Sequence, residues 1–161
     1  MNPTIRQAKE SDRACLMEWL KEPGILSYFP MCDEREVEDS SRLWITYANQ
    51  GAAFTAEVDG KVVGMIVLYI QPFEKLKHQC LFAIMVDPKC RGKGVGTYLI
   101  KEAEKTAKRK LGIEILHLEV YEKNPALKLY QRLGYKEYGR HERFLKEGDE
   151  YRTKVCMQKG L

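Results

Sequence analysis

The stretch Val86-Asp87-Pro88-Lys89-Cys90-Arg91-Gly92-Lys93-Gly94-Val95-Gly96-Thr97 decides how this chain folds. It follows the apolar run Gln79 to Val86 and leads into a segment of helical periodicity, which predicts a strand, a glycine-rich turn and the start of a helix. Such a turn exposes consecutive backbone N–H groups, and the helix N-terminus adds partial positive charge. With Arg91 and Lys93 beside them, these groups favour a phosphate or pyrophosphate ligand.

Two other kinds of glycine-rich phosphate site are excluded by their spacing. A P-loop requires Gly-x-x-x-x-Gly-Lys-Ser/Thr, and neither Gly94 nor Gly96 is followed by lysine and a hydroxyl residue. A dinucleotide-binding fold requires Gly-x-Gly-x-x-Gly near the start of a β-α-β unit. Here Gly92, Gly94 and Gly96 have a different spacing and follow several predicted strands.

Periodicity and turn residues on either side of this stretch predict a β-α-α-β-β-β-α-β-α-β-β order. The predicted strands are Thr4–Ala8, Phe54–Val58, Lys61–Ile70, Gln79–Val86, Glu114–Tyr121, Tyr135–Leu145 and Tyr151–Gln158. Asp59-Gly60 is the clearest hairpin turn. Ser11 is expected to cap the first helix, Asp33 and Glu36 to form a capping box for the second, and Asn124-Pro125 to begin the fourth.

Length and composition indicate one small soluble domain over residues 1–161, with no membrane-spanning run. The N-terminus lacks a secretory signal, and the five cysteines are an odd number without a C-x-x-C pair. We therefore expect a cytoplasmic protein with reduced thiols and no metal site. The net charge of +4 comes from 27 basic and 23 acidic residues mixed along the chain, which argues against a nucleic-acid partner.

Two blocks of sequence carry a resemblance to a known family. Arg91-Gly92-Lys93-Gly94-Val95-Gly96 resembles the R-x-x-G-x-G signature of the GNAT N-acetyltransferases. Downstream, Asn124 and Ala126-Leu127-Lys128-Leu129-Tyr130, followed by Gly134-Tyr135, resemble the later block of that family. The resemblance implies the α/β (α+β) GNAT fold, a mixed, mostly antiparallel sheet of about seven strands flanked by four helices and splayed between the fourth and fifth strands.

The same resemblance implies acetyl-CoA as cosubstrate and no metal. Strand residues would hold the pantetheine arm in the manner of an added strand, and the loop amides would hold the pyrophosphate. The implied cofactor-binding residues are Ile84, Met85, Val86, Arg91, Gly92, Lys93, Gly94, Val95, Gly96, Thr97, Asn124 and Tyr130. Asn124 stands six positions before Tyr130 where family members often have seven, and a helix N-cap explains it equally well.

The resemblance also implies two proton transfers. Tyr130 matches the family tyrosine that protonates the leaving thiolate. In a dry site, a phenol with a pKa of about 10 can donate a proton to a thiolate whose thiol has a pKa of about 8.5. An alkylamine with a pKa of about 10.4 is protonated at pH 7 and needs a base. Glu119 matches a catalytic glutamate of some members, among them the ribosomal-protein alanine acetyltransferases. His117 and water are the alternative bases.

The motifs do not specify the acceptor. We predict transfer of acetyl to a primary amine, with a small molecule favoured over a protein N-terminus or lysine. A non-catalytic acyl-CoA-binding regulatory domain is the alternative from another class, and a homodimer is compatible with either. The acceptor should lie near Lys21–Asp39 and Gly139–Arg152. Carboxylates in the first segment would attract a basic acceptor or form a solvated helix face, and they are Asp33, Glu34, Glu36, Glu38 and Asp39.

Overall fold

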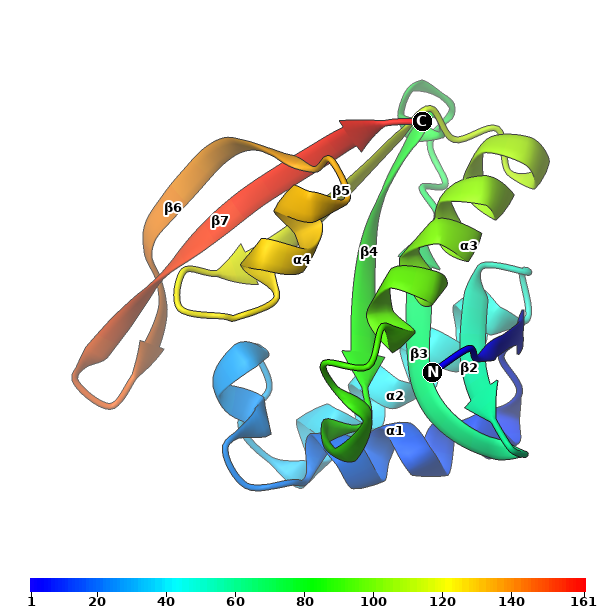
Figure 1. The fold of residues 1–161 in the computed structure, drawn as a ribbon. Coiled ribbons are helices and arrows are strands. Elements are labelled where there is room, and N and C mark those ends of the chain that lie inside the picture. The colour runs from blue at the N-terminus through cyan, green and yellow to red at the C-terminus, as the bar shows by residue number, and fades with distance from the viewer.

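The computed structural model describes all of residues 1–161 and contains seven strands and four α-helices (Figure 1). The strands are β1 (Thr4–Gln7), β2 (Ala53–Val58), β3 (Lys61–Tyr69), β4 (Gln79–Val86), β5 (Ile115–Tyr121), β6 (Lys136–Glu147) and β7 (Glu150–Gly160). The helices are α1 (Arg13–Leu20), α2 (Glu34–Ala48), α3 (Val95–Lys110) and α4 (Leu127–Arg132). None of them combines the length and apolar character needed to cross a membrane.

All seven strands form one sheet in the order β1-β2-β3-β4-β5-β7-β6. Neighbouring strands are antiparallel except for β4 and β5, which are parallel. The parallel pair follows from the chain path, because α3 connects the two strands as a crossover helix. The predicted mixed, mostly antiparallel sheet is confirmed.

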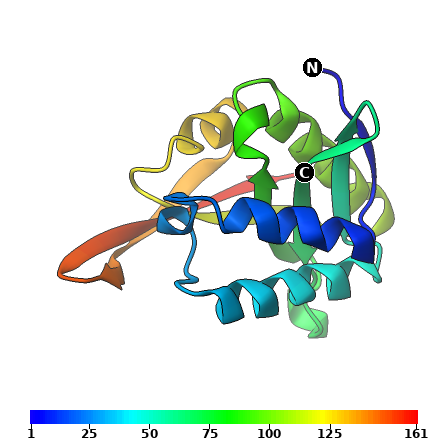
Figure 2. The ribbon, with the colours of Figure 1, turned by 90° about the horizontal axis from the view of Figure 1, so that it is seen from below.

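Strand β3 shows why the middle of the sheet is apolar at consecutive positions. Met65 and Val67 belong to the core beneath α1 and α2, whereas Ile66 and Leu68 belong to the core beneath α3. Helices α1 and α2 lie side by side across one face of the sheet, and α3 covers the other face (Figure 2). A strand buried on both faces loses the alternation of apolar and polar residues.

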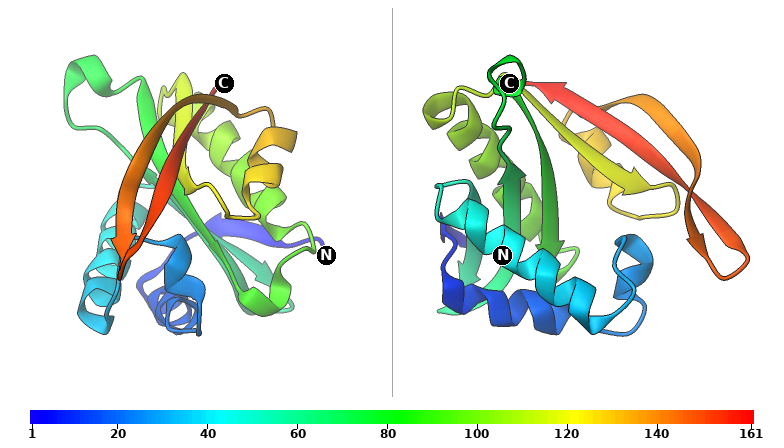
Figure 3. Two further views of the ribbon diagram at one scale, coloured as in Figure 1. Left: turned by 90° about the vertical axis from the view of Figure 1, so that its left-hand side faces the viewer. Right: turned by 180° about the vertical axis from the view of Figure 1, so that it is seen from behind.

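Strands β4 and β5 separate soon after they meet. Only Gln79, Cys80 and Leu81 of β4 have partners on β5. Beyond Leu81, β4 stays with β3 while β5 follows β7, and the two strands diverge (Figures 1 and 3). The predicted splay is therefore confirmed, and it leaves one edge of β4 without a strand partner.

Gly64 on β3 allows the first turns of α3 to lie close to the sheet. A Cβ atom at this residue would lie 3.0 Å from Leu99 Cδ1 and 3.1 Å from Val95 Cγ1. Because glycine lacks that atom, the helix can pack closely on the sheet. The N-terminus of α3 is thereby held near the C-terminal end of β4, at the wide end of the gap.

The predicted elements all occur, with ends that differ by a few residues. The hairpin at Asp59-Gly60 is confirmed, and both residues have positive φ angles. Asp33 caps α2 as predicted, because its carboxylate accepts a hydrogen bond from Glu36 N at 2.9 Å. The capping box is incomplete, however, since the Glu36 carboxylate accepts from Cys32 N and not from Asp33 N.

The predicted start of the first helix is wrong by one residue. Ser11 does not cap it, because Glu10–Asp12 form a 3₁₀ turn and α1 begins at Arg13. The Asp12 carboxylate accepts from Lys9 N at 2.9 Å, so a side chain satisfies the backbone ahead of the helix.

The predicted start of the fourth helix is also too early. Asn124 Oδ1 accepts from Ala126 N at 2.9 Å, and this local bond holds Asn124-Pro125-Ala126 in a turn. Helix α4 begins after that turn, at Leu127. Asn124 is thus the first residue of the turn that leads into the helix, and not its N-cap.

Asp12 joins β1 to β2 through a partly buried set of polar groups. Its carboxylate accepts hydrogen bonds from Arg6 at 2.7 and 2.8 Å and from Thr55 Oγ1 at 2.8 Å, in addition to the Lys9 amide. Arg6 Nε also donates to Glu57 at 2.7 Å. Burial by itself would raise the pKa of Asp12, but these hydrogen bonds outweigh it and hold the pKa below its usual value.

We expect Asp12→Asn to lower the free energy of unfolding at pH 7 by about 3 kcal/mol, because Arg6 would keep its charge and lose its main partner. Since the folded pKa of Asp12 lies below the unfolded value, the carboxylate stabilises the protein fully above about pH 4 and loses this effect as the pH falls further. Urea unfolding between about pH 5 and pH 2 should show a smaller acid-dependent loss in the variant than in the wild type. The exposed Asp149→Asn is the control. Equal acid sensitivity of the wild type and Asp12→Asn would contradict this role.

Candidate active site

Six consecutive backbone amides are free at the start of α3. The N–H groups of Arg91 through Gly96 donate no hydrogen bond to any protein group, and Thr97 is the first to do so, to Gly94 O at 3.0 Å. Gly94 is the N-cap residue, and its φ of +88° is a conformation that glycine adopts at little cost. The free amides and the positive end of the 16-residue helix together make a site for an anion.

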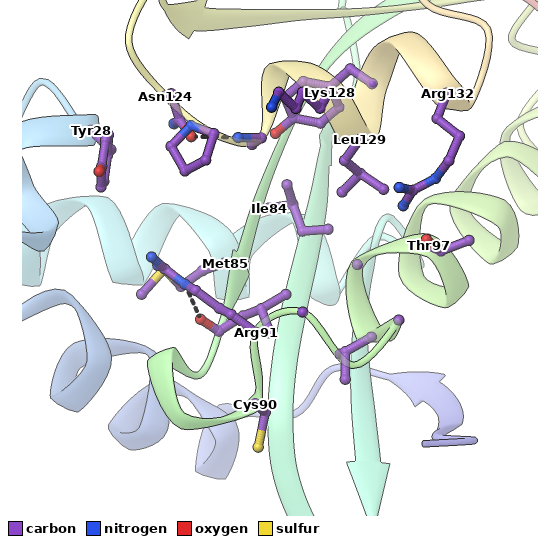
Figure 4. A pocket seen from close by; sticks show the side chains of 18 of the residues that line it. Tyr28, Ile84, Met85, Cys90, Arg91, Thr97, Asn124, Lys128, Leu129 and Arg132 are labelled. Atoms are coloured by element: carbon purple, nitrogen blue, oxygen red, sulfur yellow. Dashed lines mark hydrogen bonds between the residues drawn. The ribbon is translucent and has the colours of Figure 1, made fainter.

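The charged side chains of the loop lie in different directions. Arg91 extends toward the end of β4, where Nε donates to Val86 O at 3.4 Å and Nη2 lies 3.7 Å from Met85 Sδ (Figure 4). Lys93 turns back on its own loop and donates to Lys89 O at 3.0 Å. Arg91 is therefore the loop cation nearest the gap.

A cavity of about 420 Å³ lies between β4, the glycine-rich loop and the segment around α4 (Figure 4). Of the implied cofactor-binding residues, the structure places all but Lys93 in its lining, namely Ile84, Met85, Val86, Arg91, Gly92, Gly94, Val95, Gly96, Thr97, Asn124 and Tyr130. Lys128 and Arg132 of α4 also line it, and sequence reasoning missed both. Their spacing of four residues, which places them on one face of a helix, was the available signal.

The open edge of β4 offers backbone groups to this cavity. Asp87 N donates to Val63 O, and this pair belongs to the same register as Met85 with Met65. Because alternate residues of an antiparallel strand bond the same neighbour, the amide and carbonyl of Met85 face β3. Those of Ile84 and Val86 then face the gap, where an extended ligand can bond to them.

Tyr130 is buried among aromatic side chains at the point where β4 and β5 diverge. Its ring packs edge-on against Phe82 and Tyr135, with centroid distances of 6.1 and 6.3 Å. Only 7% of the residue is exposed, and its hydroxyl makes no hydrogen bond within the protein. Burial raises the pKa of Tyr130, so the phenol keeps its proton throughout the physiological range.

A second cavity, of about 270 Å³, adjoins the first. The two share five lining residues, namely Tyr28, Phe29, Ile84, Asn124 and Tyr130. The glycine-rich loop lines the first cavity, whereas the lining of the second is mostly aromatic and aliphatic. An extended ligand in the first cavity could therefore meet a smaller one in the second beside Tyr130.

Glu119 lines the second cavity from the polar face of β5. Its Oε1 lies 3.0 Å from Nζ of Lys154 on β7, and its side chain is 42% exposed, whereas that of Lys154 is 12% exposed. Lys154 Nζ also lies 3.9 Å from the centroid of the Phe144 ring, a cation–π distance. Sequence reasoning missed Lys154, which lies two residues beyond the expected segment Gly139–Arg152.

The histidines and the acidic segment of α2 lie elsewhere. His117 lines neither cavity; its Nε2 lies 2.5 Å from Gln79 Oε1, where β4 and β5 are still paired, and burial lowers its pKa against an opposing effect of Glu119. None of the five carboxylates from Asp33 to Asp39 lines either cavity. Glu34 pairs with Lys21, and Glu38 pairs with Arg42 and Arg13. These groups form a solvated, ion-paired helix face.

Tyr28 and Phe29 close the site from the opposite half of the molecule. Tyr28 ends the 3₁₀ turn Ile25–Tyr28 between α1 and α2, and Phe29 follows it. Arg152 Nη1 of β7 donates to Ser27 O at 3.2 Å and so links this turn to the β6–β7 hairpin. Both halves of the sheet therefore contribute walls to the two cavities.

A splayed sheet beside free amides at a helix N-terminus offers a place for an extended, phosphate-bearing ligand between two strands. The chain belongs to the acetyltransferase (GNAT) family, whose model matches residues 14–135. It is 38% identical over 97 residues to an N-alpha-acetyltransferase of Sulfurisphaera tokodaii, covering 55% of this chain and 58% of that protein. It is 28% identical over 95 residues to an L-amino acid N-acetyltransferase of Escherichia coli, covering 58% and 59%.

The whole fold recurs in solved structures. That of a phosphinothricin acetyltransferase from Sinorhizobium meliloti in complex with acetyl-CoA superposes with a TM-score of 0.82 at 21% identity, covering 100% of this chain and 89% of that one. The matches to the two relatives from Sulfurisphaera and Escherichia are shorter, since the chain spans just over half of their length.

We expect Gly94→Glu to weaken binding of coenzyme A by on the order of 100-fold, because it places an anion and a strained residue among the free amides. Isothermal titration with coenzyme A measures the affinity. Gly112→Glu is a matched control, since Gly112 also has a positive φ, of 66°, and lies just beyond the other end of α3. Equal affinity in Gly94→Glu and the wild type would show that the ligand lies elsewhere.

Proposed function

We propose that this chain transfers the acetyl group of acetyl-CoA to the primary amine of a small molecule, with residues 1–161 acting as one catalytic unit. The observation that carries the proposal is the meeting of the two cavities at Tyr130 and Ile84. The first has the groups that a phosphorylated, extended cosubstrate needs. The second has a carboxylate and room for an acceptor.

The residues of the first cavity fit coenzyme A. Its pyrophosphate would take the free amides between Arg91 and Gly96, and the amides of its pantetheine arm would bond to the open edge of β4 at Ile84 and Val86. Arg91, Lys128 and Arg132 supply positive charge around the same cavity (Figure 4). When bound, acetyl-CoA supplies the thioester carbonyl that an amine attacks.

Tyr130 and Glu119 are suited to the two proton transfers. Glu119 would accept a proton from the acceptor ammonium, directly or through water, and so free the nitrogen lone pair for attack. Tyr130 would donate its hydroxyl proton to the departing sulfur, since its hydroxyl has no competing partner in the protein and the residue lines both cavities where they meet. Glu119 is favoured over His117 because only Glu119 lines the acceptor cavity.

A small acceptor is favoured over a protein N-terminus by the small volume of the second cavity. At about 270 Å³, this cavity is the smaller of the two. The relative from Escherichia coli is named for L-amino acids, which are small acceptors. The relative from Sulfurisphaera tokodaii is named as an N-alpha-acetyltransferase, and protein N-termini are accordingly the second candidate class.

An amine panel with acetyl-CoA tests the proposal directly. Release of free thiol, together with a mass increase of one acetyl group on an amine, would support it. Tight binding of coenzyme A without turnover of any small amine or peptide would favour a non-catalytic acyl-CoA-binding domain. Turnover of peptides alone would move the acceptor class to protein N-termini.

We expect Tyr130→Phe to lower kcat by about 10²- to 10⁴-fold, because the proton donor for the leaving sulfur is lost. The affinity for coenzyme A should stay within a few fold of the wild type. Tyr135→Phe is the control, since it removes a hydroxyl from the same aromatic cluster that instead bonds to Glu104 at 3.0 Å. A wild-type kcat in Tyr130→Phe would remove the acid role.

We expect Glu119→Gln to slow the reaction most near neutral pH, where nearly all of an amine with a pKa of about 10.4 is protonated. The defect should shrink as rising pH supplies free amine without help from the protein. Initial rates from pH 7 to pH 10 measure this, with Glu122→Gln as control because Glu122 pairs with Arg140 outside both cavities. A loss that does not change with pH would indicate that Glu119 positions the acceptor and does not act as a base.

A further inference from the structure

The second cavity contains one isolated pair of opposite charges. Glu119 and Lys154 are the only charged residues in its lining. They are diagonal neighbours on one face of β5 and β7, since Glu119 is paired in register with Cys156. Most of the remaining wall is aromatic or aliphatic, and its aromatic members include Tyr28, Phe29, Trp44, Tyr69, Tyr121 and Phe144.

The Lys154 side chain is mostly buried and does not extend into solvent. Its side chain is 12% exposed, and its Nζ is fixed between Glu119 Oε1 at 3.0 Å and the Phe144 ring at 3.9 Å. An ammonium group has three donors, and Glu119 is the only acidic group paired with it. Lys154 can therefore donate to a further anionic group inside the cavity.

Charge balance then limits which amine fits. A simple alkylammonium beside Glu119 would add a second cation to a largely apolar cavity that already holds Lys154, and a buried unpaired charge is costly. A zwitterion adds no net charge. Its ammonium can pair with Glu119 while its carboxylate pairs with Lys154, so that one ion pair is replaced by two.

We infer that Lys154 selects acceptors that carry a carboxylate beside the amine, and that the preferred acceptors are α-amino acids with apolar side chains. The neighbouring carboxylate and ammonium of an α-amino acid match the adjacent Glu119 and Lys154. The aromatic wall supplies the surface against which an apolar side chain packs. This inference rests on the proposed function, because it names the substrate class of that reaction.

The test compares an amino acid with its ester in two enzymes. L-Phenylalanine and L-phenylalanine methyl ester share the side chain and the amine, but the ester lacks the negative charge. The ratio of kcat/KM for the acid to that for the ester should fall about 10- to 100-fold in Lys154→Met. Lys154→Arg keeps the positive charge and should restore part of the ratio. Comparing ratios between enzymes cancels the different intrinsic reactivity of the two amines.

Lys136→Met is the matched control, since Lys136 is an exposed residue of β6 in neither cavity, and its ratio should equal that of the wild type. An unchanged ratio in Lys154→Met, with both amines acetylated, would overturn the selection by Lys154 and leave the proposed function intact. Failure of the wild type to acetylate any amine, despite binding acetyl-CoA, would overturn the proposed function and this inference with it.

Discussion

The early separation of β4 from β5 is the constraint on which the rest of the structure depends. After Leu81 the two strands share no pairing, and Phe82 packs instead against Tyr130 and Tyr135. Unpaired backbone groups in a sheet normally cost stability unless water or a ligand bonds to them. The edge of β4 that carries Ile84 and Val86 thus offers backbone groups to which the proposed cosubstrate can bond.

The free amides at the start of α3 are a second set of unpaired backbone groups, and these favour a negatively charged ligand. A loop that bonds internally would have no donors left for an anion, and here the amides from Arg91 to Gly96 are all available. Gly64 allows α3 to approach the sheet, so these donors lie near the open edge of β4. In the proposed function, backbone groups therefore bind the common part of the cosubstrate, while the side chains of Glu119 and Lys154 determine the acceptor.

The sequence was most informative where local physics sets the outcome. Alternation along β5, the Asp59-Gly60 turn and the glycine-rich loop depend on short-range periodicity and φ preferences, so these elements could be predicted from the residues themselves. The splay between β4 and β5 and the site beside it were implied by the resemblance to the GNAT family. Long-range pairing was harder to predict. Lys154 contacts Glu119 only because β7 lies between β5 and β6 in the sheet. The order of strands in a sheet cannot be predicted from the periodicity of the individual strands. The helix starts near Ser11 and Asn124 differed because local side-chain bonds form turns ahead of the helices.

The most direct measurement of the central claim is amide hydrogen exchange of the intact protein with and without coenzyme A. The amides of Arg91 to Gly96, which have no acceptor in the protein, should exchange rapidly alone and become strongly protected when coenzyme A binds, together with Ile84 on the open edge of β4. Binding of coenzyme A that leaves these amides unprotected, or that protects a different surface, would contradict the assignment of this gap as the cosubstrate site.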